Sequence, residues 1–138
     1  LNIMAYDTVK INELNKFYSH MTQKACAESK LFVKAQDTMQ MIRDNNVTLL
    51  DVRTEGEVSI IALSGKNSIH IPIKDLFQKD NLVKIPTKKP IVIVCYSGTR
   101  AVLSAIGLKQ IGFKDIHVLK GGIVELSKAN NTKNAPLK

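Results

Sequence analysis

Short apolar runs alternate with helical patterns along most of this chain, and this alternation limits the possible folds more than any other feature. The apolar runs are residues 31–35, 47–52, 68–73, 90–95 and 115–119. The helical patterns between them are residues 37–45, 55–63, 74–79 and 100–111. Alternation of this kind predicts an α/β fold in which a central parallel sheet carries helices on both faces.

The first thirty residues follow a different pattern. Apolar side chains recur there at three- and four-residue spacing, with lysine and glutamate between them: Ile11, Leu14, Tyr18, Met21 and Ala25. This spacing predicts one amphipathic helix over residues 7–29. The chain of 138 residues is long enough for one ordinary core. We therefore expect an N-terminal helical extension at 1–30, one α/β domain at 31–130 and a flexible polar tail at 131–138.

Composition and charge exclude several classes of protein. No apolar run approaches the length that crosses a bilayer, so we expect no membrane span. The chain carries twenty Lys and Arg and a net charge of +8, but these residues are scattered and are densest only at 88–90. Four Phe, three Tyr and no Trp offer few stacking platforms, so we expect no nucleic-acid partner. The positive field instead favours the steering of small anions toward a cleft.

The two cysteines also restrict the chemistry. Neither Cys26 nor Cys95 has a histidine or a second cysteine within four residues, so we expect no metal site, no cofactor and no disulfide framework. Cys26 is interpreted as a packing residue of the N-terminal helix. A free, reactive thiol is the use left open for Cys95.

Cys95 stands where an unbroken apolar strand, 91–95, gives way to a turn at 96–99 and a helix that is predicted to begin near Arg100. Ligand sites of open parallel sheets lie beyond the carboxyl ends of the strands. Backbone N–H groups converge in such a turn, and the helix N-terminus adds positive potential. This field lowers the pKa of a thiol, so we predict that Cys95 is a thiolate nucleophile and that Gly98 adopts left-handed backbone angles. The alternative is a small core residue at a strand end.

Four segments occur in an order typical of one known family: LLDVRTEGE (49–57), IHIPI (69–73), CYSGTR (95–100) and GFKDIHVLKGGI (112–123). With these segments the chain resembles the rhodanese family, the sulfurtransferase homology domain, over about residues 31–129. The resemblance implies a three-layer fold with a parallel sheet of about five strands. It also implies that a cysteine takes a sulfane sulfur from a donor, holds it as a persulfide and passes it to an acceptor.

The resemblance assigns roles to the loop. Cys95 is the nucleophile, and the substrate-binding residues are Tyr96, Ser97, Gly98, Thr99 and Arg100. The implied partners are a small anionic donor such as thiosulfate or polysulfide, and a thiol, a cyanide-like nucleophile or an acceptor protein. Related polysulfide-handling proteins carry N-terminal helices and pair as dimers, so a homodimer through the N-terminal helix and packing of that helix on its own domain are equal alternatives. The compartment is expected to be the cytoplasm, or the periplasm if an upstream signal was removed.

Loop length separates two chemistries on this fold. Four residues lie between Cys95 and Arg100, whereas related phosphatases and arsenate reductases have one more, which makes room for a tetrahedral oxyanion. The short loop suits a single terminal sulfur that accepts N–H groups from residues 97–100. It favours a sulfurtransferase over a phosphatase or arsenate reductase. A non-catalytic binding or regulatory module of the same fold is the second hypothesis.

Residues outside the loop are expected to support it or to contact the substrate. Asp51 is expected to accept backbone N–H groups and brace the loop, and Arg53 is expected to pair with Glu57 across one helical turn. Contact of Arg53 with the substrate is the alternative. The segment LSGKNS at 63–68 lacks the His and Pro of the Gly-His-Ile-Pro-Gly-Ala segment that usually borders the pocket. Lys66 could supply a charge there instead.

Overall fold

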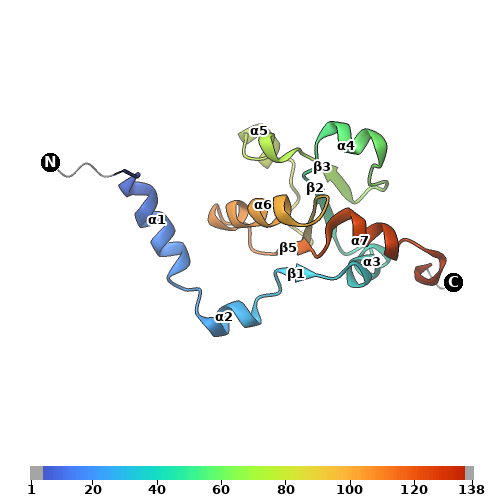
Figure 1. Cartoon of the computed structure of the whole chain (residues 1–138), viewed down its shortest axis with the longest axis horizontal. Coiled ribbons are helices and arrows are strands. Elements are labelled where there is room, and N and C mark those ends of the chain that lie inside the picture. Colours follow the sequence, from blue (N-terminus) through green and yellow to red (C-terminus); the bar gives the residue numbers. More distant parts are fainter. Residues whose placement is uncertain (1–4, 136–138) are drawn as a thin grey trace. The chain divides into compact units, whose positions relative to one another are not determined.

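The computed structural model describes residues 5–135 and divides the chain into two compact units, residues 1–30 and 31–138. The second unit contains one parallel sheet with strand order β1-β5-β4-β2-β3 (Figure 1). Its strands are β1 Phe32–Val33, β2 Thr48–Asp51, β3 Ser68–His70, β4 Ile91–Val94 and β5 Ile116–Leu119. The predicted α/β class and the sheet of about five parallel strands are confirmed.

Helices cover both faces of this sheet. One face is covered by α5 (Lys79–Leu82) and α6 (Thr99–Gln110), and the other by α3 (Ala35–Arg43) and α7 (Gly122–Ala129). Figure 1 shows α3 and α7 beside one another. Helix α4, Glu55–Ile60, follows β2. Among the helices of residues 5–135, none has the length and apolar character that a membrane span needs.

Alternating side chains of the strands build the two halves of the core. Leu50 and Ile93 pack with Leu108 of α6 on one face. Leu49 and Val92 pack with Leu126 of α7 on the other. The central strands β2 and β4 are buried along their whole length, as expected for strands that are covered on both sides.

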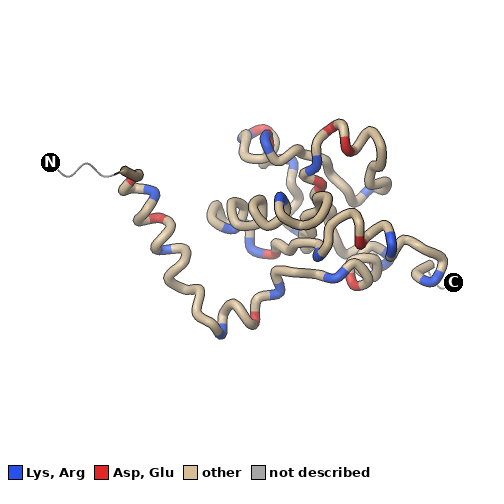
Figure 2. The backbone as a smooth tube through the Cα atoms, viewed as in Figure 1, with Lys and Arg blue, Asp and Glu red and all other residues tan. Residues whose placement is uncertain are grey.

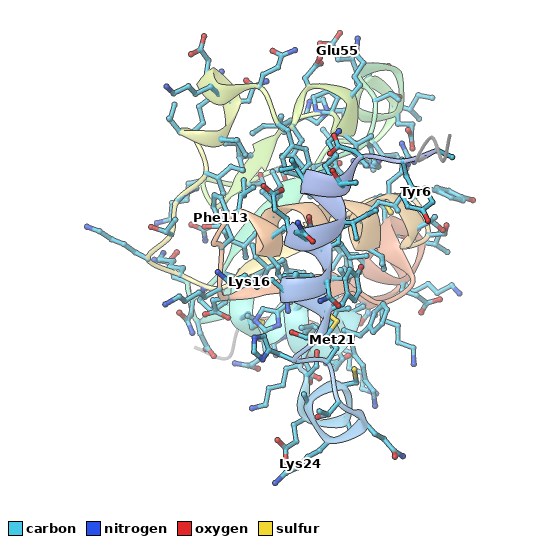
Figure 3. The ribbon with its side chains drawn as sticks, turned by 90° about the vertical axis from the view of Figure 1, so that its left-hand side faces the viewer. Tyr6, Lys16, Met21, Lys24, Glu55 and Phe113 are labelled. Atoms are coloured by element: carbon cyan, nitrogen blue, oxygen red, sulfur yellow. The ribbon has the colours of Figure 1, made fainter. Side chains whose placement is uncertain are left out.

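The N-terminal unit is not the single helix over 7–29 that the spacing predicted. It consists of α1 (Thr8–Tyr18) and α2 (Gln23–Glu28), and Met21 lies in the link between them (Figure 3). The helix restarts because Thr22 is a second N-cap, whose hydroxyl accepts the backbone N–H of Ala25. Val9, Ile11, Leu14 and Tyr18 of α1 are exposed in this unit. The homodimer stays a prediction.

Two further segments differ from expectation. The helix predicted at 74–79 is instead a 3₁₀ turn, Ile73–Asp75, followed by α5. The polar tail predicted at 131–138 forms a second 3₁₀ turn, Thr132–Asn134, within its described part. The side chain of Asn134 is buried and donates to the carbonyl oxygen of Ala129, and Arg43 of α3 donates to the Asn134 carbonyl oxygen at 2.5 Å. These bonds attach residues 131–135 to α3 and α7, while 136–138 lie outside the described residues.

Candidate active site

The thiol of Cys95 lies at the carboxyl end of β4, in the turn that leads into α6. Its residue is 1 % exposed, and its Sγ accepts the backbone N–H groups of Gly98 at 3.0 Å and Ala101 at 3.4 Å. Gly98 is the N-cap of α6 and has a φ of 126°, in the region predicted for it. Donors aimed at the sulfur stabilise negative charge on it.

Ala101 is a contact that the sequence analysis missed, since the donors were expected from residues 97–100. Helix α6 begins at Thr99, so Ala101 lies in its first turn. The N–H groups of a first helical turn have no partner within the helix and are free to donate elsewhere. The predicted start of the helix could therefore have indicated that N–H groups of its first turn reach the sulfur.

The Gly-Gly pair after β5 packs against the backbone of the loop. Gly121 and Gly122 both have positive φ, 79° and 62°, and Ile123 donates its N–H to the Cys95 carbonyl oxygen at 2.8 Å. A Cβ atom on Gly122 would lie 2.3 Å from the carbonyl oxygen of Tyr96. Only glycine at this position lets α7 approach the loop backbone so closely.

Arg100 is held by Glu57 of α4. The two groups form a bidentate ion pair with Nη1–Oε1 and Nη2–Oε2 distances of 2.6 and 2.9 Å. The hydrogen bonds from Arg100, with smaller contributions from Thr54, lower the pKa of Glu57 from 4.5 to about 2, although burial opposes the change. The same hydrogen bonds raise the pKa of Arg100. The expected pairing of Glu57 with Arg53 is therefore wrong.

Arg53 pairs with Asp51 instead, and both side chains are 3 % exposed. Arg53 Nε and Nη2 donate to the two Asp51 carboxylate oxygens at 3.0 and 2.8 Å. Nη2 also donates to the Ile61 carbonyl oxygen at 2.8 Å. Asp51 accepts a backbone N–H, as expected, but that N–H belongs to Arg53. The pair thus ties the end of β2 to the segment after α4.

A pocket of about 400 Å³ adjoins the loop at the carboxyl edge of the sheet. Its walls include Val52, Pro72, Lys74 and Arg100. Lys66, which was expected to serve a pocket beside the loop, lines a different pocket with Thr48, the first residue of β2. That position is at the opposite edge of the sheet, because parallel strands present their amino ends together.

Comparison with protein families decides the class of this chain. The sequence model of the rhodanese-like domain matches residues 34–129, which is more than half of the chain. The chain belongs to the rhodanese-like family. A rhodanese-related protein of Thermoplasma volcanium is 30% identical in sequence, covers 71% of this chain and 91% of its own, and superposes with a TM-score of 0.61.

Two further relatives place this rhodanese-like domain in context. A tRNA uridine(34) hydroxylase of Hamiltonella defensa is 28% identical over an alignment of 116 residues that covers 80% of this chain and 32% of that relative's length. The human single-domain sulfurtransferase covers 75% of this chain and 100% of its own, with a TM-score of 0.62. At 16% sequence identity, this structural likeness shows a shared fold and nothing further. The relatives of this chain thus include an enzyme, the hydroxylase, and the human sulfurtransferase shares the fold.

The rhodanese-like domain brings most of the predicted site residues into one place. Tyr96, Ser97 and Thr99 are exposed in the loop, and Arg100 is half-buried at its end. Asp51 and Arg53 lie at the end of the neighbouring strand β2. Their roles toward a substrate stay predictions.

The Glu57→Gln variant is expected to have a free energy of unfolding at neutral pH that is lower by about 0.5–1 kcal/mol, because it loses the ion pair with Arg100. The effect is small because the Glu57 side chain is 32 % exposed and water screens its charge. Glutamine keeps the capping arrangement with Thr54, so the change removes mainly charge. Because the folded-state pKa of Glu57 is depressed, its contribution is present above pH 4.5 and is lost as the pH falls through about 2. Urea unfolding of both proteins along this pH range measures the difference. A difference that does not shrink toward pH 2 would contradict the assignment.

Proposed function

We propose that this domain is a sulfurtransferase that moves a sulfane sulfur from an anionic donor, such as thiosulfate or polysulfide, to a nucleophilic acceptor through a persulfide on Cys95. The observation that carries the proposal is the position of the Cys95 sulfur at the carboxyl end of β4, where Gly98 and Ala101 direct N–H groups at it. A terminal sulfur added to Cys95 would carry the negative charge that such donors stabilise.

The chemistry consists of two displacements on sulfur. In the first, the Cys95 thiolate attacks the outer sulfur of thiosulfate, a new S–S bond forms, the S–S bond of thiosulfate breaks, and sulfite leaves with the electron pair. In the second, cyanide or a thiolate attacks the terminal sulfur, and the electron pair of the broken bond returns to Cys95. The products are thiocyanate or a new persulfide, and no external oxidant or reductant is needed.

Two features favour the second hypothesis, a binding or regulatory module without turnover. Cys95 is 1 % exposed, so its sulfur offers little surface to a donor. Arg100, the cation expected to bind the donor, is already neutralised by Glu57. The two hypotheses differ in whether sulfur is ever bound covalently, so one measurement separates them.

The test is intact-mass analysis of the protein after exposure to thiosulfate and, separately, to polysulfide, followed by cyanide. Cys26 is exposed, which differs from the packing role interpreted from the sequence, and it could take up sulfur by itself, so the measurement is made on the Cys26→Ser variant. We expect a gain of one or more sulfur atoms that cyanide removes. No gain from either donor, in protein that is folded by circular dichroism, would reject the sulfurtransferase and support the binding module.

A further inference from the structure

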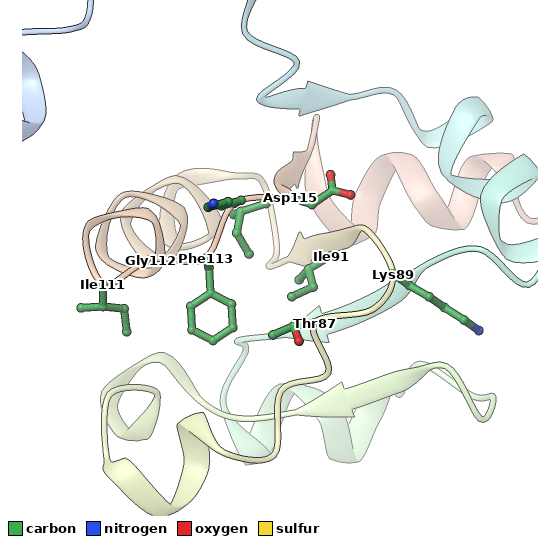
Figure 4. A pocket seen from close by; sticks show the side chains of 9 residues that line it. Thr87, Lys89, Ile91, Ile111, Gly112, Phe113 and Asp115 are labelled. Carbon is green, nitrogen blue, oxygen red and sulfur yellow. The ribbon is translucent and has the colours of Figure 1, made fainter.

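Two adjoining pockets lie where the strands of the sheet begin, at the end opposite to Cys95. The first, of about 360 Å³, is lined by Phe113 and by Ile91 and Ile116, the first residues of β4 and β5 (Figure 4). The second, of about 490 Å³, is lined by Thr48 and Ser68, the first residues of β2 and β3. The pockets and the Cys95 loop therefore lie at opposite ends of the strands. At about 3.3 Å per residue, they are separated by roughly 13 Å of strand.

The two pockets share a wall, since Thr87 and Lys89 line both of them. In Figure 4 the ring of Phe113 and the side chains of Ile91 and Thr87 lie around the first pocket, while the Lys89 side chain extends away from them. The two pockets together form one groove. The first pocket is its apolar part, beside Phe113, and the second pocket is its polar part, on the other side of residues 87–89.

Lysines dominate the polar part of the groove. The second pocket is lined by Lys66, Lys84, Lys88 and Lys89. The ammonium groups of Lys84 and Lys89 contact the amide oxygens of Asn81 and Asn45, at 3.3 and 3.4 Å, which leaves their charges uncompensated by these contacts. Within residues 5–135, Asp115 contributes the one carboxylate that lines either pocket.

The fold gathers these lysines from separate segments. Lysine and arginine are spread over the whole backbone (Figure 2), and although Lys84, Lys88 and Lys89 are near neighbours in sequence, their spacing does not predict that Lys66 joins them. Lys66 precedes β3, whereas Lys84, Lys88 and Lys89 precede β4. Because β2 lies between β3 and β4 in the sheet, the segments before β3 and β4 converge on the amino end of β2.

The groove has the chemistry of a site for several linked negative charges. A concave wall with one sign of charge concentrates anions, and lysine binds phosphate groups as a point charge. The hydroxyl groups of Thr48 and Thr87 add hydrogen-bond donors to the same walls, whereas the Ser68 hydroxyl donates to the Gly65 carbonyl oxygen. No aromatic side chain of residues 5–135 lines the second pocket, so it lacks the stacking platforms that bind single-stranded nucleic acid.

We infer that the second pocket binds an oligophosphate, either the phosphate chain of a nucleotide or a free inorganic oligophosphate. For a nucleotide, the adjoining first pocket receives the base and sugar beside Phe113 and Ile111. The site lies at the edge of the sheet away from Cys95 and does not depend on sulfur transfer.

The test is isothermal titration of the full chain with tripolyphosphate and, separately, with ATP, at low ionic strength and without divalent cations. The variant Lys84→Gln/Lys88→Gln removes two exposed lysines of the groove. Lys120→Gln/Lys128→Gln removes the same charge from exposed positions that line neither pocket. We expect roughly tenfold weaker binding of tripolyphosphate in the first variant and little change in the second, with binding that weakens as salt is added.

The two ligands distinguish the two sources of phosphate. Equal affinity for tripolyphosphate and ATP indicates a free oligophosphate. Tighter binding of ATP, with the excess lost in Ile111→Ser, indicates a nucleotide; Ile111 is 53% exposed, so its replacement leaves the core intact. The absence of binding by both ligands at low ionic strength, or equal losses in the two lysine variants, would overturn the inference. Thermal unfolding verifies that each variant is folded.

Discussion

The Cys95→Ser variant is expected to lose sulfur transfer from thiosulfate to cyanide by at least about a thousandfold, because a serine hydroxyl forms no persulfide. The fold should persist, since an oxygen at this position can accept the same N–H groups from Gly98 and Ala101. Thiocyanate formation measures the transfer, and circular dichroism verifies the fold.

The matched control is Cys26→Ser, which removes the other thiol, located on α2. It should keep the wild-type rate of thiocyanate formation. If Cys95→Ser retained the rate and Cys26→Ser lost it, the persulfide would belong to Cys26 and the proposed site would be wrong. If neither wild type nor variants formed thiocyanate or took up sulfur, the domain would be the binding module.

The Asp51→Ala variant is expected to lower the free energy of unfolding by about 3–5 kcal/mol, because it leaves the guanidinium of Arg53 buried without its counter-ion. Arg53 is 3 % exposed, and its Nη2 is also held by the Ile61 carbonyl oxygen. Urea unfolding followed by circular dichroism measures the loss. A loss below about 1 kcal/mol would mean that the pair is solvated in solution.

The double variant Asp51→Ala/Arg53→Met isolates the uncompensated charge. Removing both partners and filling the space with an apolar side chain should recover a large part of the lost stability. Glu125→Ala offers a surface comparison, because Glu125 pairs with Lys128 where both side chains are exposed, at 46% and 68%. Its expected effect is below about 1 kcal/mol. Equal losses in the double and single variants would assign the effect to packing rather than to charge.

The ion pairs show where reasoning from neighbouring residues stops. Arg53 and Glu57 have the spacing of a helical pair, so their pairing was a reasonable expectation. Helix α4 starts at Glu55, however, so Arg53 lies before the helix, next to Thr54, whose backbone is extended. Its guanidinium turns back to Asp51, which leaves Glu57 for Arg100, 43 positions further along the chain. No local pattern contains a contact over that separation.

The N-terminal helices and the groove lysines show the same limit in two other forms. Apolar spacing ran through Thr22 without a break, although threonine is a favoured N-cap and divides the segment into α1 and α2. Lys24 and Lys16 extend from different helices (Figure 3), and Lys24 pairs with Glu28 of its own helix at 4.0 Å. In the second pocket, Lys66 meets Lys84, Lys88 and Lys89 because strands β3 and β4 flank β2. Scattered charge in a sequence therefore does not exclude a charged site in the fold.

The sequence by itself determined the α/β class, the strands and the loop that begins at Cys95, because apolar periodicity, the glycine of the turn and the start of α6 are all local properties of the chain. Only the tertiary structure decided which charges meet: Asp51 with Arg53, Glu57 with Arg100, and the lysines of the groove. The physical reason is that strand order and helix packing place side chains from distant segments together. Burial then decides how strongly a pair affects stability: Asp51 and Arg53 are 3 % exposed, whereas Glu57 and Arg100 are partly screened by water.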